Sequence, residues 1–93
     1  MKVLYEFYED FGRDGSLNGV FVAEDYEVEK LYGNEVYFGE ILGKHSEIFC
    51  NITKENLKEI DDVDDLFVNT FDMYFPTGIG YNPLLRWKED QRG

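Results

Sequence analysis

The sequence predicts an α+β fold: a four-stranded, mainly antiparallel sheet with two helices packed on one face, in the order ββαββα. Three observations lead to it. In residues 2–11 the side chains of successive apolar residues alternate between two faces, with the period of a strand. Short apolar runs flanked by turn residues follow. In residues 61–75 apolar residues recur with the period of a helix. Paired strands with segregated helices are the α+β arrangement. The 93 residues form one acidic domain, 1–93, whose charged end, 88–93, is expected to be a frayed tail.

A hairpin is expected at the beginning of the chain. Val3, Tyr5 and Phe7 share one face of the alternating stretch 2–11, and aromatic and β-branched residues favour a strand there. Residues 12–16 contain two glycines that suit a loop. The segment 20–23 is apolar on both faces, which is typical of a central strand. We expect the two strands to pair antiparallel.

A short helix is expected over residues 24–32. Asp25 is placed to cap its N-terminus, and Gly33-Asn34 is placed to end it. At about two turns this helix depends on tertiary packing for stability. Its buried edge is predicted to consist of Val28, Leu31 and Tyr32.

A second pair of strands is expected over residues 35–42 and 47–52, joined by a tight connection at 43–46. In the second of them one face is predicted to hold Ile48, Cys50 and Ile52. Thr53 is then expected to cap a short helical turn in which Leu57 and Ile60 are three residues apart.

The stretch around which the rest is organised is the long helix expected over residues 61–75, which Pro76 ends. Its apolar residues fall on one face with period 3.6, and we expect that face to anchor the core. They are Val63, Leu66, Phe67, Thr70, Phe71 and Tyr74. The opposite face carries Asp61, Asp65, Asn69 and Asp72. One further helical turn is expected over residues 83–87.

The charge balance restricts the partners. With 20 acidic and 9 basic residues the formal charge is −11. Such a chain repels nucleic acid and anionic membranes, because binding either requires lysine and arginine. We therefore expect no direct nucleic-acid or membrane contact and a basic protein as the favoured partner. The alternative is that the charge only keeps a small protein soluble.

Motifs for catalysis or metal binding are missing from the sequence. The twelve residues 61–72 have the length of an EF-hand loop, but Val63, Leu66 and Asp72 stand where that loop needs a ligand, a glycine and a glutamate. Cys50 is the only cysteine, so neither a disulfide nor a thiolate zinc cluster forms within the chain. We predict no catalytic residues, no metal and no cofactor.

One enzymatic alternative stays open. A small hydrolase would use His45, the only histidine, with Glu40 or Glu47. The beginning of the chain lacks the apolar run of a signal peptide, and no segment approaches the ~20 apolar residues of a membrane span. The expected location is the cytoplasm, which for a phage-encoded protein is that of the host.

The acids themselves are the candidate site. Five aspartates lie within residues 61–72, or about one charge per ~3.6 Å of helix, close to the ~3.4 Å of one DNA strand. If both helices lie on one side of the sheet, their outward faces form one extended negative surface. The predicted partner-binding residues are Asp61, Asp62, Asp64, Asp65, Asp72, Glu24, Asp25, Glu27 and Glu29.

In size, charge and aromatic content the chain resembles small phage or mobile-element proteins that block host restriction or CRISPR systems. This resemblance implies an inhibitor of a host defence system. The clustered acids predict that it is a non-enzymatic DNA mimic, which occupies the basic cleft of a nucleic-acid-binding defence protein. The alternative is a small regulatory or structural interaction module that binds through the 40–47 hairpin and exposed aromatics. Homodimerisation would use such aromatics as well. The aromatics considered are Tyr5, Tyr8, Phe38, Phe49, Tyr81 and Trp87.

Overall fold

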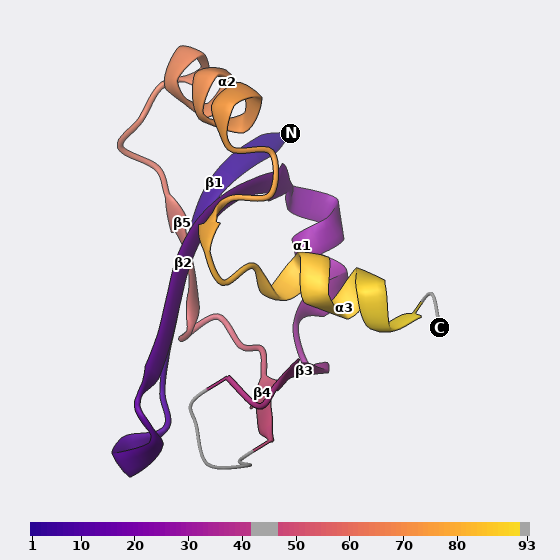
Figure 1. Cartoon of the computed structure of the whole chain (residues 1–93). Helices are drawn as coiled ribbons and strands as arrows, with labels where there is room; N and C mark the ends of the chain where they lie inside the picture. Colours follow the sequence, from indigo (N-terminus) through magenta and orange to yellow (C-terminus); the bar gives the residue numbers. More distant parts are fainter. Residues whose placement is uncertain (42–46, 92–93) are drawn as a thin grey trace.

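A computed structural model describes residues 1–41 and 47–91 (Figure 1). Its elements in chain order are β1 (Lys2–Asp10), the 3-10 helix η1 (Gly12–Asp14), β2 (Ser16–Glu24), α1 (Asp25–Leu31), β3 (Glu35–Gly39), β4 (Ile48–Asn51), β5 (Leu57–Ile60), α2 (Asp65–Tyr74), β6 (Ile79–Gly80) and α3 (Pro83–Gln91).

The strands form two antiparallel sheets. One has the strand order β5-β1-β2-β6, and the other pairs β3 with β4. The predicted hairpin of β1 and β2 is confirmed, with Tyr5 opposite Phe21 and Asp10 opposite Ser16. The α+β class is also confirmed. The prediction of a single four-stranded sheet built from two hairpins is wrong, because β3 and β4 pair only with each other among the described strands. The predicted tight connection at 43–46 lies outside the described residues.

The helical turn expected after Thr53 is wrong, because Leu57–Ile60 form strand β5. Thr53 does act locally as expected, since its Oγ1 accepts a hydrogen bond from the Glu55 backbone N–H at 3.2 Å. The residues after it extend along the free edge of β1, where Leu57 lies opposite Phe7 and Ile60 opposite Leu4. Backbone pairing with β1 therefore overrides the helix-like spacing of two apolar residues.

The main core lies between the inner face of the four-stranded sheet and the layer formed by α1, α3 and the β3–β4 sheet. One ring pair joins its two layers, since Phe7 of β1 lies 5.7 Å from Phe38 of β3. Another lies within the four-stranded sheet, where Tyr5 of β1 is 5.6 Å from Phe21 of β2. The buried members of this core are Tyr5, Phe7, Leu17, Phe21, Val28, Leu31, Val36, Phe38, Ile48, Cys50, Ile52, Leu57 and Leu84. The predicted inward face of β4 is thus confirmed.

Helix α2 lies on the other face of the sheet. Alternation along β1 directs Lys2 and Leu4 away from the face that carries Tyr5 and Phe7. Leu4 is buried outside the main core cluster, and Lys2 pairs with Asp72 of α2. Figure 1 shows α2 apart from α1 and α3, which are packed together. The expectation that the helices share one face is therefore wrong.

The end of the chain is more ordered than expected. Helix α3 extends to Gln91, so residues 88–91 are helical rather than frayed. Lys88 makes an ion pair with Glu27 of α1, which ties the two helices together.

The backbone of Tyr81, just before α3, lies very close to Gly19 of β2. A side chain at Gly19 would overlap the Tyr81 backbone. None of the helices in the described residues has the length and hydropathy that crossing a membrane requires.

Candidate functional site

The aspartates before α2 are held by the beginning of the helix. Strand β5 ends at Ile60, and the chain turns through 61–64 before α2 begins at Asp65. Asp64 caps the helix, since its Oδ1 accepts a hydrogen bond from the Phe67 backbone N–H at 2.9 Å. Carboxylates are stabilised here by the positive end of the helix dipole. The turn 61–64 and the first residue of α2 therefore place four aspartates at this end of the helix.

Four of these aspartates keep their charge uncompensated. Asp61, Asp62, Asp64 and Asp65 are exposed. Within residues 1–41 and 47–91, no lysine, arginine or terminal amino group lies within 4.0 Å of them. Asp72, the fifth acid predicted from this helix, differs because its carboxylate pairs with Lys2 at 2.7 Å. The acidic cluster, defined as Asp61, Asp62, Asp64 and Asp65, is thus the unpaired part of the predicted α2 site.

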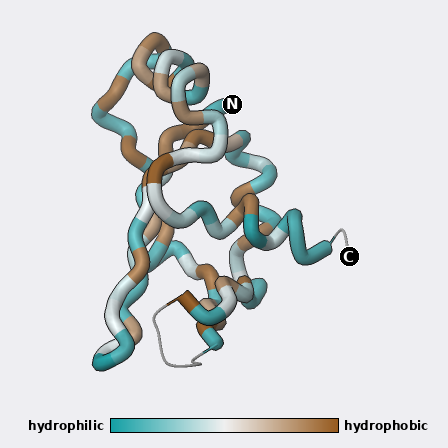
Figure 2. Tube along the Cα trace, in the orientation of Figure 1, coloured by the Kyte–Doolittle hydropathy of each residue, from teal (hydrophilic) through white to brown (hydrophobic). Residues whose placement is uncertain are grey.

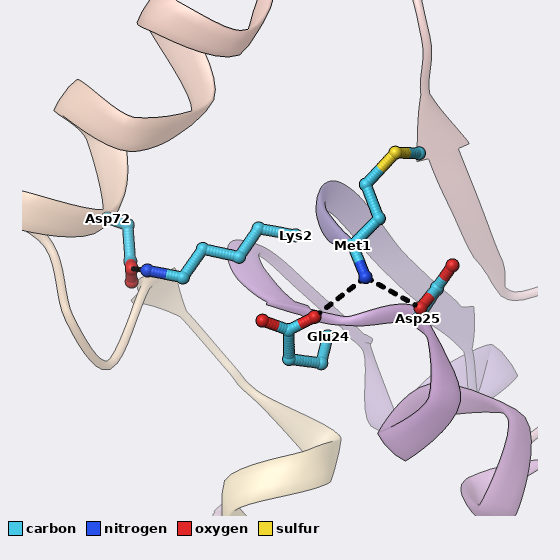
Figure 3. A network of polar contacts seen from close by, with 5 residues as sticks. All are labelled: Met1, Lys2, Glu24, Asp25 and Asp72. Atoms are coloured by element: carbon cyan, nitrogen blue, oxygen red, sulfur yellow. Dashed lines mark hydrogen bonds and ion pairs between the residues drawn. The ribbon is translucent and has the colours of Figure 1, made fainter.

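The acids predicted around α1 are largely neutralised. The amino group of Met1 contacts Glu24 at 2.8 Å and Asp25 at 3.2 Å (Figure 3), and Lys88 pairs with Glu27. Hydrogen bonds to the same two carboxylates raise the pKa of the Met1 amino group. Asp25 was expected to cap α1, but its carboxylate binds the amino group, and the N-cap is Glu24 without a side-chain hydrogen bond. Only Glu29 of this set is both exposed and without an ion pair among the described residues.

The two acidic series meet at the beginning of the chain. Figure 3 shows Asp72 with Lys2 beside Met1 with Glu24 and Asp25. Where the α1 series and the α2 series come near each other, the acids are Glu24, Asp25 and Asp72, each bound to a cation, so the meeting point is an ion-pair network. Because α1 and α2 lie on opposite faces of the sheet, their outward faces do not form the single extended surface considered from the sequence.

The apolar face predicted for α2 is exposed. Val68 is the only buried residue of this helix and is 7% exposed, whereas Leu66 is 74% exposed. Met73 and Tyr74 are 71% and 72% exposed, and Phe67 is 49% exposed. Figure 2 shows hydrophobic stretches of α2 at one end of the molecule, and no residue of α2 belongs to the buried core cluster. The expectation that this face anchors the core is therefore wrong.

A buried polar cluster lies at the other end of the sheet, and no pattern in the sequence predicted it. The Asn56 Nδ2 donates to the Glu9 carboxylate at 2.7 Å and contacts Cys50 Sγ at 3.3 Å. Burial, and then the Glu9 charge, raise the pKa of the Cys50 thiol to about 12. A thiol in this state is a poor nucleophile, because the thiolate is the reactive form. The cluster fixes the connection between β4 and β5.

The aromatics considered for an interface divide into three groups according to their exposure to solvent. Tyr5 and Phe38 are buried in the core, while Tyr8 and Phe49 are exposed. Phe49 lies 4.9 Å from the ring of Tyr37 on the outer side of the β3–β4 sheet. Tyr81 and Trp87 are half-buried against the core. The expectation that some of these rings are exposed is confirmed.

Other chemical features are few in the part of the chain that the structure describes. An open groove of about 330 Å³ on the outer face of the four-stranded sheet is lined by residues such as Tyr8, Val20 and Ile79. Within residues 1–41 and 47–91, no group of three or more histidine, cysteine, aspartate or glutamate side chains is placed to hold a metal ion. His45 of the hydrolase alternative lies outside the described residues.

The described residues define a small α+β protein in which one helix carries an unpaired acidic cluster beside an exposed apolar face. No protein-family model, curated protein or solved structure matches this chain with significance.

Proposed function

We propose that this protein is a non-enzymatic acidic inhibitor that acts as a DNA mimic and occupies the basic cleft of a nucleic-acid-binding protein. Anti-restriction or anti-CRISPR activity against a host defence nuclease is the form of this function that the charge and size suggest. The observation that carries the proposal is the acidic cluster, four neighbouring exposed carboxylates without an ion pair in the described structure.

Unpaired carboxylates matter because a carboxylate that is bound to a cation within the molecule attracts a basic partner only weakly. Glu24, Asp25, Glu27 and Asp72 bind cations within the molecule, so they stabilise the fold and add mainly to the long-range field. The acidic cluster meets a basic cleft directly and displaces the phosphates that the cleft would bind. A net charge of −11 adds electrostatic steering, which raises the association rate at low salt.

Salt-dependent competition with DNA tests the proposal. The immobilised protein is mixed with a bacterial lysate at low salt, and bound proteins are eluted with rising salt or with duplex DNA. We expect it to retain nucleic-acid-binding proteins and to release them to DNA. The variant Asp61→Asn/Asp62→Asn/Asp65→Asn should release them at clearly lower salt. Asp64 is left intact because it caps α2.

A matched control separates local charge from total charge. Asp14→Asn/Glu35→Gln/Glu55→Gln removes three exposed acids elsewhere and changes the net charge by the same amount. This control should bind like the unchanged protein. Equal loss in both triple variants would show that only total charge matters, and captured proteins that DNA does not displace would rule out the mimic.

A second candidate function is supported by the ring pair of Tyr37 and Phe49. Tyr37 and Phe49 flank residues 40–47 in the chain, and the Tyr37 hydroxyl donates to the Glu47 carboxylate at 3.4 Å. Residues 42–46 of that hairpin lie outside the described structure. An interaction module of this kind would bind independently of salt. Its binding would be lost in Phe49→Ser and kept in the triple aspartate variant.

A further inference from the structure

We infer that the apolar face of α2 is a docking surface for a basic amphipathic helix of the partner protein. The apolar face is defined as the exposed side chains Leu66, Phe67, Met73, Tyr74 and Phe75. The inference deepens the proposed function and depends on it for the basic character of the partner. It adds that the partner is recognised by apolar anchors as well as by charge.

The geometry of α2 places these side chains away from the sheet. At about 100° per residue, Leu66 and Met73 point roughly opposite to the buried Val68. The two are seven residues apart, so they line one stripe of the helix. Tyr74 and Phe67, also seven apart, line the next stripe. Phe75 extends the surface past the helix end, where its ring lies 5.2 Å from that of Phe71.

The size of the surface fits a single helix better than a folded copy of the chain. A large side chain presents about 150–250 Å² when fully exposed, so the apolar face presents on the order of 500 Å². That is near the largest patch of a typical monomer, and such patches usually mark binding sites. A stable dimer needs about 800 Å² per partner. The apolar face alone is smaller than this.

Charge determines what kind of helix fits. The acidic cluster lies directly before the apolar face, and Asp65 and Leu66 are adjacent in the chain. A second copy would bring its own cluster and a charge of −11 toward these unpaired carboxylates, which like-charge repulsion disfavours. A helix with apolar residues at i, i+4 and i+7 and lysine or arginine beside them satisfies both surfaces.

Model peptides test this directly. The probe is a labelled helical peptide of leucine and lysine in which the leucines form one face. A peptide of the same composition with the leucines dispersed, and oligolysine of the same charge, serve as comparisons. Fluorescence anisotropy should show the amphipathic peptide binding at least about tenfold more tightly than the dispersed one. Equal affinities for the two leucine–lysine peptides would overturn the inference.

Variants separate the apolar and charged contributions. Leu66→Ser/Met73→Ser should abolish the tenfold preference and leave oligolysine binding unchanged; the control Tyr8→Ser/Phe49→Ser, which removes exposed aromatics elsewhere, should keep the preference. The triple aspartate variant should weaken binding of every peptide. A preference that survives Leu66→Ser/Met73→Ser contradicts the docking surface.

Two further measurements distinguish loss of peptide binding from unfolding of a variant and from dimerisation of the protein. Circular dichroism of each variant confirms that the exposed substitutions leave the fold intact. Sedimentation equilibrium examines the second copy: a dimer that Leu66→Ser/Met73→Ser makes monomeric would overturn the proposed occupant. The proposed function fails separately, when duplex DNA does not displace captured proteins. In that case the peptide preference still decides whether the apolar face docks a basic helix.

Discussion

The Nζ of Lys2 in β1 donates to the Oδ2 of Asp72 in α2 at 2.7 Å, across the face of the sheet opposite the main core (Figure 3). This contact joins the beginning of the chain to a helix 70 residues later. With the buried Val68, it directs the Asp72 side of α2 toward the sheet. The strongly apolar side of an amphipathic helix therefore faces outward.

Reversing the charge of Lys2 should loosen α2 without unfolding the protein. In Lys2→Glu a carboxylate would face Asp72, and the amides of α2 should exchange hydrogen about tenfold faster. The effect on global stability should be small, because the pair is exposed to solvent. Hydrogen exchange by mass spectrometry measures the effect, with Lys58→Glu on the exposed surface of β5 as the control. Unchanged protection of α2 would show that the ion pair does not hold it.

Truncation of two nearby apolar residues should affect stability very unequally. Val68→Ala removes buried methyl groups and should lower the free energy of unfolding by about 1–3 kcal/mol. Leu66→Ala removes an exposed side chain and should change it by no more than about 0.5 kcal/mol. Urea denaturation of both variants measures this. The reverse ranking would mean that the face predicted from the sequence is the one packed on the sheet.

Alkaline pH should destabilise the fold partly through Cys50. Its pKa is raised to about 12 by burial and by Glu9, whereas a thiol in the unfolded chain ionises near pH ~8.5. Between these values the folded chain binds more protons than the unfolded chain, so this contribution to stability falls as pH rises. The melting temperature should decrease from pH ~8 to pH ~10, and less so in Cys50→Ala.

The reactivity of Cys50 gives an independent check. At pH ~8 the folded protein should react with a disulfide reagent far more slowly than the protein unfolded in guanidinium. Burial of Tyr5 also raises the pKa of its phenol, and this contribution remains in the Cys50→Ala variant. Fast labelling of the folded chain would contradict the buried thiol.

A methyl group at Gly19 should be among the most damaging small changes. It would overlap the Tyr81 backbone and push the segment before α3 away from β2. We expect Gly19→Ala to cost about 3 kcal/mol or more. Gly33→Ala, at a residue with a φ of 85° and open space around it, should cost only about 1 kcal/mol. Thermal denaturation of both variants measures the difference, and equal costs would argue against the close approach.

Local patterns predicted a large part of the fold. Alternation along β1 predicted a strand, the apolar residues of β4 predicted its buried face, and Asn34 lies at the end of α1 as expected. These features depend on neighbours in the chain, which a sequence displays directly. Strand β5 was missed because its partner, β1, lies some 50 residues earlier. The residues near β5 in the chain contain no pattern that predicts pairing with the edge of a strand so distant in the sequence.

The sequence by itself determined the excess of acid, the amphipathic character of α2 and the aspartates at its beginning. Only the tertiary structure decided which of those acids are paired and which side of α2 is buried. The reason is physical: helical periodicity defines two faces but does not assign either to the core. That choice followed from Lys2 and Leu4, two residues on the sheet face that α2 covers.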